Sequence, residues 1–404
     1  MATVIGRAAP VVRQGLRHRS TATRPVPSWR ALDWPLLLGV LALTTLGTLL
    51  VWSATSHRTD LTGGDSTAYL GKELVNVAIG LLLLAVVLVA DHRWVRIAAP
   101  LVYLASIVGL VLVLVMGSTI NGSRSWLVLG GMSIQPSEFA KLAVIIGMAL
   151  VLAERAAGRW RATVGTVEVL LMLAVAGVPA LLIISQPDLG TTLVLTATVL
   201  GVLAASGAPR RWLALLGLSG VLAAVAAVVG GVLKPYQVDR FLAFLNPDLD
   251  PRGAGYNVEQ ARIAVGNGGL FGQGLFGGSQ TRSGFVPEQH TDFVFTVAGE
   301  ELGLVGAAAL ILLLGIVLWR ALRIAARTDD VFGRVAAAGI ACWFGFQAFQ
   351  NIGMCLGIMP VTGVPLPFVS YGGSSLFASM LAVGLLQNIH LRAALVARRG
   401  VAYA

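Results

Sequence analysis

The sequence predicts an all-α integral membrane protein with about ten transmembrane helices and a large extracellular loop between helices 7 and 8. Composition is the first of three observations behind this fold class. Hydrophobic residues make up 56% of the 404 residues, charged residues only 12%, and the mean hydropathy is +0.81. Soluble domains carry about 25% charged residues, so this chain cannot cover a water-facing surface of its size. Most of its outer surface must therefore face lipid.

Ten apolar stretches are the second observation, since each approaches or exceeds the roughly 20 residues that a helix needs to cross a bilayer. Backbone groups in the hydrocarbon layer must bond within their own segment, which favours helices. The ten-residue alternating segments of a membrane β-barrel are absent. The predicted spans are residues 35–54, 74–90, 97–116, 137–153, 164–184, 189–206, 213–233, 294–319, 335–357 and 372–391.

The placement of lysine and arginine is the third observation, because short cytoplasmic connections carry an excess of both. With the N-terminus inside, 20 of the 29 basic residues lie in the tails and inner connections. We therefore expect a multi-pass protein of the cytoplasmic membrane with both termini in the cytoplasm. The net charge of +10 could indicate nucleic acid, but these residues are scattered in short connections rather than on a folded domain. Membrane lipids are the expected partner, and nucleic acid is not.

The chain divides into three predicted parts. Residues 1–32 are basic and lack the apolar core of a cleavable signal peptide, which predicts a disordered cytoplasmic tail near anionic lipid headgroups. Residues 33–395 form one polytopic membrane domain, and residues 396–404 form a short cytoplasmic tail. Both cysteines, Cys342 and Cys355, fall in one apolar run and offer no disulfide framework.

The outer connection at residues 234–292 is far longer than the others, and loops of this length are usually functional or disordered. Its many aromatic and aliphatic residues predict that it folds back on the membrane face. Residues 256–265 are expected to form a short surface helix, which the glycine-rich run 266–278 ends. That run lacks the Gly-Lys-Ser/Thr ending of a phosphate-binding loop, so we interpret it as a flexible, turn-rich connector.

Asp292 ends this loop and begins the eighth span, on the outer side. A carboxylate at a helix start can simply cap it by accepting free backbone N–H groups. However, Glu300 and Glu301 follow about 12 Å deeper on the same helix. Ionisable groups inside a span indicate an interior, functional environment. Asp292 is therefore a candidate catalytic residue, with a helix cap as the alternative.

The fourth span opens with Gln135, and Glu138 and Lys141 follow three residues apart, so they share a helix face and can pair. They form either an interfacial ion pair that closes the helix start or a pair that lines an outward-facing polar cavity. Upstream of them, Arg124 could bind phosphate oxygens bidentately. Trp126 is interpreted as an interfacial anchor.

Two further outer turns carry polar groups. Asp188, between spans five and six, is suited to cap a helix. The uncharged, proline-rich connection at residues 359–371 leads into Gly372, Gly373, Ser374 and Ser375 at the start of span ten. Free N–H groups at a glycine-led helix start bind anions, and a tightly turned re-entrant plug is the alternative.

These polar residues gather in the outer half of the bilayer. A transporter is expected to have polar groups near the midplane and on both sides, whereas an enzyme that acts on a lipid-linked substrate in the outer leaflet needs this asymmetry. The sequence contains no His, Asp and Glu cluster at metal-ligand spacing and no Gly-x-Ser-x-Gly elbow. Acid/base chemistry on a carboxylate is the class that remains.

Five segments, in this order, resemble the SEDS family (shape, elongation, division and sporulation) of bacterial cell-wall synthesis. They are residues 121–126, 135–141, 186–191, 287–293 together with 300–303, and 365–375, and the resemblance extends over residues 35–395. Two other segments, residues 253–272 and 359–367, look more like the elongation branch of the family than the division branch.

The resemblance implies a peptidoglycan glycosyltransferase that polymerises lipid II at the outer face of the bacterial cytoplasmic membrane, together with a class B penicillin-binding protein. It implies an essential acid at Asp292, and Mg²⁺ or Mn²⁺ as a cofactor without a dedicated visible site. Expected substrate-binding residues are Arg124, Gln135, Glu138, Lys141, Asp188, His290, Ser370, Gly372, Gly373, Ser374 and Ser375.

In the expected reaction, Asp292 takes a proton from a sugar hydroxyl that attacks the anomeric carbon of another lipid II, with inversion. Lys141, Arg124 or a bound cation would stabilise the departing diphosphate. The alternatives are a lipid II flippase, a scaffold for the penicillin-binding protein and a division-type polymerase. A flippase would suit the polar residues within spans, which are Asn76, Gln347, Gln350 and Asn351.

Overall fold

The computed structural model describes residues 31–401 apart from residues 121–122, 130–131, 157–163, 232–236, 239, 241–242, 245 and 247–252. Nearly all of the predicted N-terminal tail and part of the long loop therefore lie outside the described residues. Within the described chain, ten helices are long and apolar enough to cross a membrane. This confirms the prediction of a helical membrane protein with ten spans.

The ten helices follow the apolar stretches of the sequence in order. Most ends agree within a few residues, but the second span begins six residues before its predicted start, and the last helix continues to Val401, into the predicted C-terminal tail. They are α1 (Trp34–Ser56), α3 (Ala68–Val89), α4 (His92–Met116), α5 (Pro136–Ala156), α6 (Thr166–Ser185), α7 (Leu189–Ser206), α8 (Arg210–Val229), α13 (Gly303–Arg327), α14 (Val331–Cys355) and α15 (Gly373–Val401).

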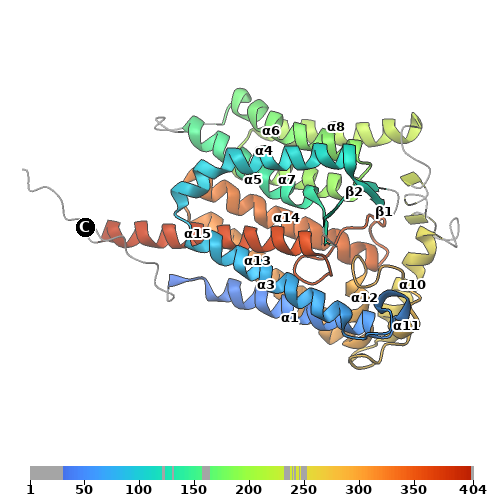
Figure 1. The fold of residues 1–404 in the computed structure, drawn as a ribbon. Coiled ribbons are helices and arrows are strands. Elements are labelled where there is room, and N and C mark those ends of the chain that lie inside the picture. Colours follow the sequence, from blue (N-terminus) through green and yellow to red (C-terminus); the bar gives the residue numbers. More distant parts are fainter. Residues whose placement is uncertain are drawn as a thin grey trace, which may run out of the picture.

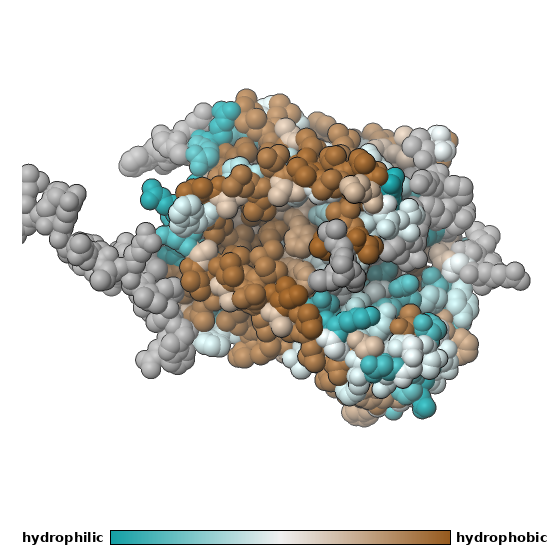
Figure 2. All heavy atoms as spheres, viewed as in Figure 1, coloured by the Kyte–Doolittle hydropathy of each residue, from teal (hydrophilic) through white to brown (hydrophobic). Residues whose placement is uncertain are grey.

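Helices α5, α14 and α15 form the centre of the bundle, and most of their side chains are buried. Around them, α3, α4 and α8 present apolar side chains on the outside, and α8 contributes no buried residue at all. Figure 2 shows this apolar surface as a brown band along the flank of the bundle, with polar residues gathered at its ends. The band is the surface expected to contact lipid.

The predicted eighth span, residues 294–319, is not one helix. It consists of α12 (Val294–Glu301) and α13, separated at Leu302 and Gly303, where φ of Gly303 is +66°. The glycine-rich run of the loop satisfies the backbone groups that this break exposes. Gln273 N donates to Glu300 O (3.0 Å), and Leu304 N donates to Gly269 O (2.9 Å).

The same run is closely packed, so its interpretation as a flexible connector is wrong. A Cβ atom added at Gly268 would lie 1.9 Å from the carbonyl oxygen of Gly299. Helix α10 (Ala254–Asn267) precedes the run and confirms the predicted surface helix, and the short α11 (Ser279–Ser283) follows it. Only glycine allows the two backbones to approach this closely.

Glu300 and Glu301 hold this loop instead of facing a cavity. The Glu300 carboxylate accepts hydrogen bonds from the backbone N–H groups of Gln280 (2.7 Å) and Thr281 (3.0 Å). Glu301 accepts a hydrogen bond from the Ser53 hydroxyl on α1 (2.6 Å). These hydrogen bonds explain why two acidic side chains are buried here: they attach the long loop to the bundle.

Three short antiparallel strands, which the sequence did not predict, follow α4. They are β1 (Ser118–Ile120), β2 (Ser123–Leu129) and β3 (Met132–Ile134), in the order β1-β2-β3. They turn the chain back to the start of α5 and, with α10, α11, α12 and the one-turn α2 (Thr59–Thr62), cover one end of the bundle (Figure 1). This end is called the loop end below.

The opposite end is held by polar contacts among α1, α3, α13 and α15. Asp33, at the start of α1, forms a buried ion pair with Arg320 on α13. Asn388 on α15 donates to the carbonyl oxygens of Val87 (3.1 Å) and Ala90 (2.6 Å) where α3 ends.

Substituting Gly272 tests the close packing of the loop. Its φ is +78°, and an added Cβ would lie 2.1 Å from the Glu301 carbonyl oxygen. Left-handed backbone costs about 1–2 kcal/mol and overpacking about 1–3 kcal/mol. We expect Gly272→Ala to lower the free energy of unfolding by about 2–5 kcal/mol, measured by unfolding of the purified protein in detergent.

Gly274 is the matched control. Its φ is +88°, but an added Cβ would meet no neighbouring atom of the described chain. Gly274→Ala should therefore cost only about 1–2 kcal/mol. Equal losses for the two variants would show that the loop does not press against α12.

Candidate functional site

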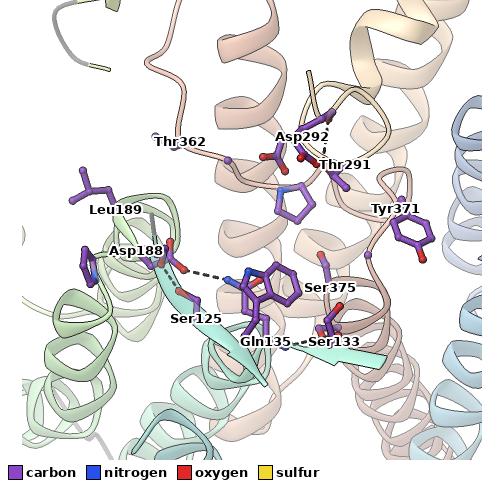
Figure 3. Close-up of a pocket in the computed structure, with 18 of the residues that line it drawn as sticks. Ser125, Ser133, Gln135, Asp188, Leu189, Thr291, Asp292, Thr362, Tyr371 and Ser375 are labelled. Carbon is purple, nitrogen blue, oxygen red and sulfur yellow. Dashed lines mark hydrogen bonds between the residues drawn. The ribbon is translucent and has the colours of Figure 1, made fainter. Parts of the chain in front are cut away.

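A cavity of about 210 Å³ opens at the loop end of the bundle. It lies between the strands, the starts of α7 and α15, the end of the long loop and the segment at residues 360–367, called the proline segment below. Figure 3 shows Asp292 and Asp188 reaching it from different elements. Its lining residues are Ser123, Ser125, Trp126, Ser133, Gln135, Pro187, Asp188, Leu189, Arg240, Glu288, Thr291, Asp292, Thr362, Gly363, Pro365, Tyr371, Gly372, Ser374 and Ser375.

Asp292 stands in the turn that precedes α12. Its backbone N–H and that of Phe293 both donate to Glu288 O (3.0 and 3.3 Å). Helix α12 begins two residues later without a side-chain cap, so the helix-cap alternative is wrong. No described residue donates a hydrogen bond to the Asp292 carboxylate, which leaves it available to a substrate in the cavity.

The surroundings of Asp292 favour its protonated form. Burial, followed by repulsion from the Glu288 carboxylate, raises the pKa of Asp292 to about 7, although the Arg240 guanidinium acts in the opposite direction. A carboxyl group with a pKa near neutrality can exchange a proton at the pH of a cell. Such shifted groups are typical of functional sites.

Asp188 is both a helix cap and a cavity residue. Its carboxylate accepts hydrogen bonds from the Thr191 backbone N–H (3.0 Å) and hydroxyl (2.8 Å) at the start of α7, which confirms the predicted cap. It also accepts a hydrogen bond from Gln135 Nε2 across the cavity wall (3.2 Å). Burial raises the pKa of Asp188.

The starts of α5 and α15 meet at the cavity. Gln135 N donates to the Ser374 hydroxyl (2.9 Å), and Gly372, Ser374 and Ser375 line the wall next to it. The Ser375 hydroxyl has no hydrogen-bond partner in the described chain, although the residue is only 6% exposed. It points into the cavity in Figure 3, at the first turn of α15.

Glu138 and Lys141 pair as predicted but do not line the cavity. Lys141 Nζ donates to Glu138 Oε1 (2.7 Å) and to Gln347 Oε1 on α14 (2.7 Å), and the two charged side chains are 0% and 2% exposed. Gln347 Nε2 in turn donates to Pro365 O in the proline segment (2.9 Å). The pair therefore supports a cavity wall from behind, and its predicted contact with the cavity is wrong.

Four other predicted binding residues also lie outside the cavity lining. Arg124 donates to the carbonyl oxygens of Gly117 and Val115 at the end of α4 (both 2.8 Å), so it fastens β2. The Ser370 hydroxyl accepts a hydrogen bond from Leu366 N (2.8 Å). Gly373 lies against α3: a Cβ atom added at Gly373 would be 3.1 Å from Asn76 Oδ1.

His290 is the fourth of these residues. It is packed between the rings of Tyr69 and Tyr371, with centroids 5.2 and 5.7 Å away. Burial lowers the pKa of His290, which keeps the ring neutral near pH 7. Its carbonyl oxygen accepts a hydrogen bond from Tyr371 N (3.0 Å), so His290 joins the end of the long loop to the start of α15.

The cavity contains residues that the sequence did not single out as site residues. Arg240 brings a positive charge from the long loop. Glu288 and Tyr371 belong to segments that carry the family resemblance, and this resemblance was the sequence signal that could have identified them as site residues. Trp126 lines the cavity although it was predicted only as an interfacial anchor.

The buried ion pair predicts a clear stability effect. Lys141→Met leaves the Glu138 carboxylate buried without its partner, which costs about 3–5 kcal/mol. The double variant Glu138→Gln/Lys141→Met removes both charges and should recover most of this loss. Unfolding in detergent measures the stability of both variants. If Lys141→Met were as stable as the unmodified protein, the buried arrangement of the pair would be contradicted.

Comparison with known proteins places this architecture in a family. A family model for FtsW, RodA and SpoVE, described as "Cell cycle protein", matches residues 34–394. The chain is 38% identical to the peptidoglycan glycosyltransferase MrdB of Escherichia coli K12 over 89% of this chain and 93% of that protein. It is 39% identical to a probable peptidoglycan glycosyltransferase FtsW of Trichlorobacter lovleyi, over 88% of this chain and 92% of the relative.

Similarity to solved structures agrees with these sequence matches. A chain from a peptidoglycan synthase complex that coordinates polymerisation and crosslinking superposes with a TM-score of 0.75 at 34% identity, covering 90% of this chain and 99% of that one. The rod shape-determining protein RodA of Thermus thermophilus gives a TM-score of 0.63 at 34% identity, covering 90% and 97%. The sequence segments, the ten-helix bundle and these matches agree, and the chain belongs to the FtsW/RodA/SpoVE family, the SEDS family of the sequence analysis.

Proposed function

We propose that this protein is a peptidoglycan glycosyltransferase that polymerises lipid II into glycan strands during cell elongation. The observation that carries the proposal is the Asp292 carboxyl group, which faces the cavity without a hydrogen-bond partner in the described chain and has a pKa of about 7. Relatives at 38–39% identity over most of the chain are named peptidoglycan glycosyltransferases. A membrane bundle with a polar cavity at one end suits a substrate whose lipid part stays in the bilayer.

In the proposed reaction, Asp292 acts as general base. It takes the proton of a sugar 4-hydroxyl, whose oxygen forms a bond to the anomeric carbon of a second lipid II. The bond from that carbon to the diphosphate oxygen breaks, and the polyprenyl diphosphate leaves with the electron pair. Attack opposite the leaving group inverts the anomeric carbon. A positioned base of this kind contributes about 10²–10⁴-fold to the rate.

The leaving diphosphate needs donors and positive charge. The start of α15 would offer its first N–H groups with the hydroxyl of Ser375, and Arg240 lines the same cavity. These groups replace Lys141 and Arg124, whose donors are already used within the protein. Gln135 and Asp188 would bind the sugars on the opposite wall.

We propose that Mg²⁺ or Mn²⁺, when it takes part, is bound mainly through the substrate diphosphate. Within the described ranges, no group of three or more His, Cys, Asp or Glu side chains could hold a metal ion. The donor set therefore does not fit a resident metal cage, and no step of the proposed reaction depends on one.

Orientation and partner follow from the same proposal. The loop end would face the outside, where lipid II is used, and both termini would lie in the cytoplasm, in agreement with the excess of basic residues there. A class B penicillin-binding protein would crosslink the strands, since one structural match belongs to a synthase complex that couples polymerisation and crosslinking.

The flippase alternative loses much of its support. Gln347, Gln350 and Asn351, which would suit a polar path through the membrane, are 0% exposed and donate to carbonyl oxygens at the loop end. They hold the proline segment and do not line a path. Identities to MrdB and FtsW relatives are similar, so the elongation role rests on the elongation-like segments at residues 253–272 and 359–367 and on the RodA structural match.

Polymerisation in detergent tests the function. Purified protein with its penicillin-binding partner is incubated with lipid II, where no membrane sidedness exists. We expect glycan strands from the unmodified protein and a loss of about 10²-fold or more with Asp292→Asn, which keeps the shape but removes the base. The variant's helical circular dichroism is the control for folding. Equal product from both would remove Asp292 from the mechanism.

The pH dependence tests the raised pKa. Asp292 accepts a proton only when ionised, so kcat/KM should fall as the pH drops through about 7. An ordinary aspartate would place this fall near about pH 4. Glu288→Gln removes a repulsion that raises the pKa of Asp292, so its midpoint should move to lower pH. Initial rates of polymerisation measure both profiles, and a midpoint near 4 would contradict the assignment.

A further inference from the structure

A single buried amide joins the two walls of the cavity. Asn351 on α14 is 0% exposed, and its Nδ2 donates to the carbonyl oxygen of Asp292 (2.7 Å) and to the carbonyl oxygen of Val364 (2.7 Å). Asp292 belongs to the end of the long loop and Val364 to the proline segment. The two N–H groups of one side chain thus fix two segments that lie 72 residues apart in sequence.

The contact is made at the residue that carries the proposed base. Asp292 N already donates to Glu288 O, so the Asn351 amide fixes the second backbone polar group of the same residue. On the far wall, Gly363 precedes Val364 with φ of +69°, and a Cβ added there would lie 3.1 Å from Asp292 Oδ2. Locking Val364 therefore also sets how closely the wall approaches the carboxylate.

Neighbouring amides on α14 hold the proline segment but not Asp292. Gln347 Nε2 donates to Pro365 O (2.9 Å), and Gln350 Nε2 donates to Pro360 O (3.3 Å) and to the Thr362 hydroxyl (3.1 Å). Gln350 and Asn351 follow Gln347 at spacings of three and four residues, so each of them lies on the same side of α14 as Gln347. Within the described chain, Asn351 is the member of this group that reaches both walls.

We propose that Asn351 is a positioning residue for the reaction: it holds the Asp292 backbone against the proline segment and so aims the carboxylate at the reacting hydroxyl. The inference rests on the proposed role of Asp292 as base. Asn351 touches no substrate itself, because its side chain is enclosed behind the cavity wall. A displacement of the base by about 1 Å can reduce a rate about 10²-fold.

The experiment compares Asn351→Leu and Asn351→Ala with the unmodified full-length protein, by lipid II polymerisation in detergent. Leucine has a branched side chain of similar size to asparagine but no hydrogen-bond donors. Alanine also lacks the donors and is too small to overpack the site. We expect kcat to fall about 10- to 100-fold while KM for lipid II stays within about threefold, because the substrate contacts remain. An unchanged kcat in either variant would overturn the proposal.

Asn388 is the matched control. It is also a buried asparagine whose Nδ2 donates to two carbonyl oxygens, those of Val87 and Ala90, but it lies at the opposite end of the bundle. Asn388→Ala should lower the melting temperature as Asn351→Ala does and leave kcat within about twofold. A loss of kcat that follows the melting temperature in both variants would make Asn351 merely structural.

Asp292→Asn, measured in parallel, separates this inference from the proposed function. If Asp292→Asn polymerises lipid II at the unmodified rate, the role of Asp292 fails and Asn351 has no base to position. If Asp292→Asn is inactive and the Asn351 variants keep full kcat, only the positioning role is wrong.

Discussion

The architecture of the loop end depends on one constraint: backbone groups enclosed in a membrane protein need partners, because no water reaches them. The proline segment does not form a helix, so its enclosed carbonyl oxygens have no donors within their own segment. Helix α14 supplies the donors through Gln347, Gln350 and Asn351. The buried pair of Glu138 and Lys141 then fixes Gln347 from the other side. An unpaired carbonyl would cost about 1–3 kcal/mol at each position, which explains why so many amides are placed inside one helix.

The sequence was sufficient to predict the bundle because a membrane span is a local property. Apolar runs of about 20 residues define each helix without reference to its neighbours. The break between α12 and α13 was missed for the opposite reason. Its backbone groups pair with the glycine-rich run, about 30 residues earlier in the chain. The local pattern of a single helix therefore gives no sign of this pairing. The three strands were missed because each has only three to seven residues and they pair within a connection of 19 residues.

For the site, sequence spacing identified the right residue types but not their surroundings. The three-residue spacing of Glu138 and Lys141 correctly predicted a pair, yet their burial depends on Gln347 and Trp343 from a helix 200 residues away. Asp188 is a cap and a cavity residue together, so its two predicted roles were not exclusive. Arg240 was not predicted, because only the folded loop brings it to the cavity.

The bridge made by Asn351 has a consequence for a polymer-forming enzyme. Separating the long loop from the proline segment would leave two carbonyl oxygens without donors, so this edge of the cavity resists widening. The opposite edge is also bridged: on β2, the Ser123 hydroxyl donates to Gln186 O (2.8 Å) before α7, and Gln135 Nε2 donates to the Asp188 carboxylate (3.2 Å). Both edges are therefore tied by hydrogen bonds between separate segments, so the Asp292 carboxylate keeps its place relative to the cavity wall from one reaction to the next.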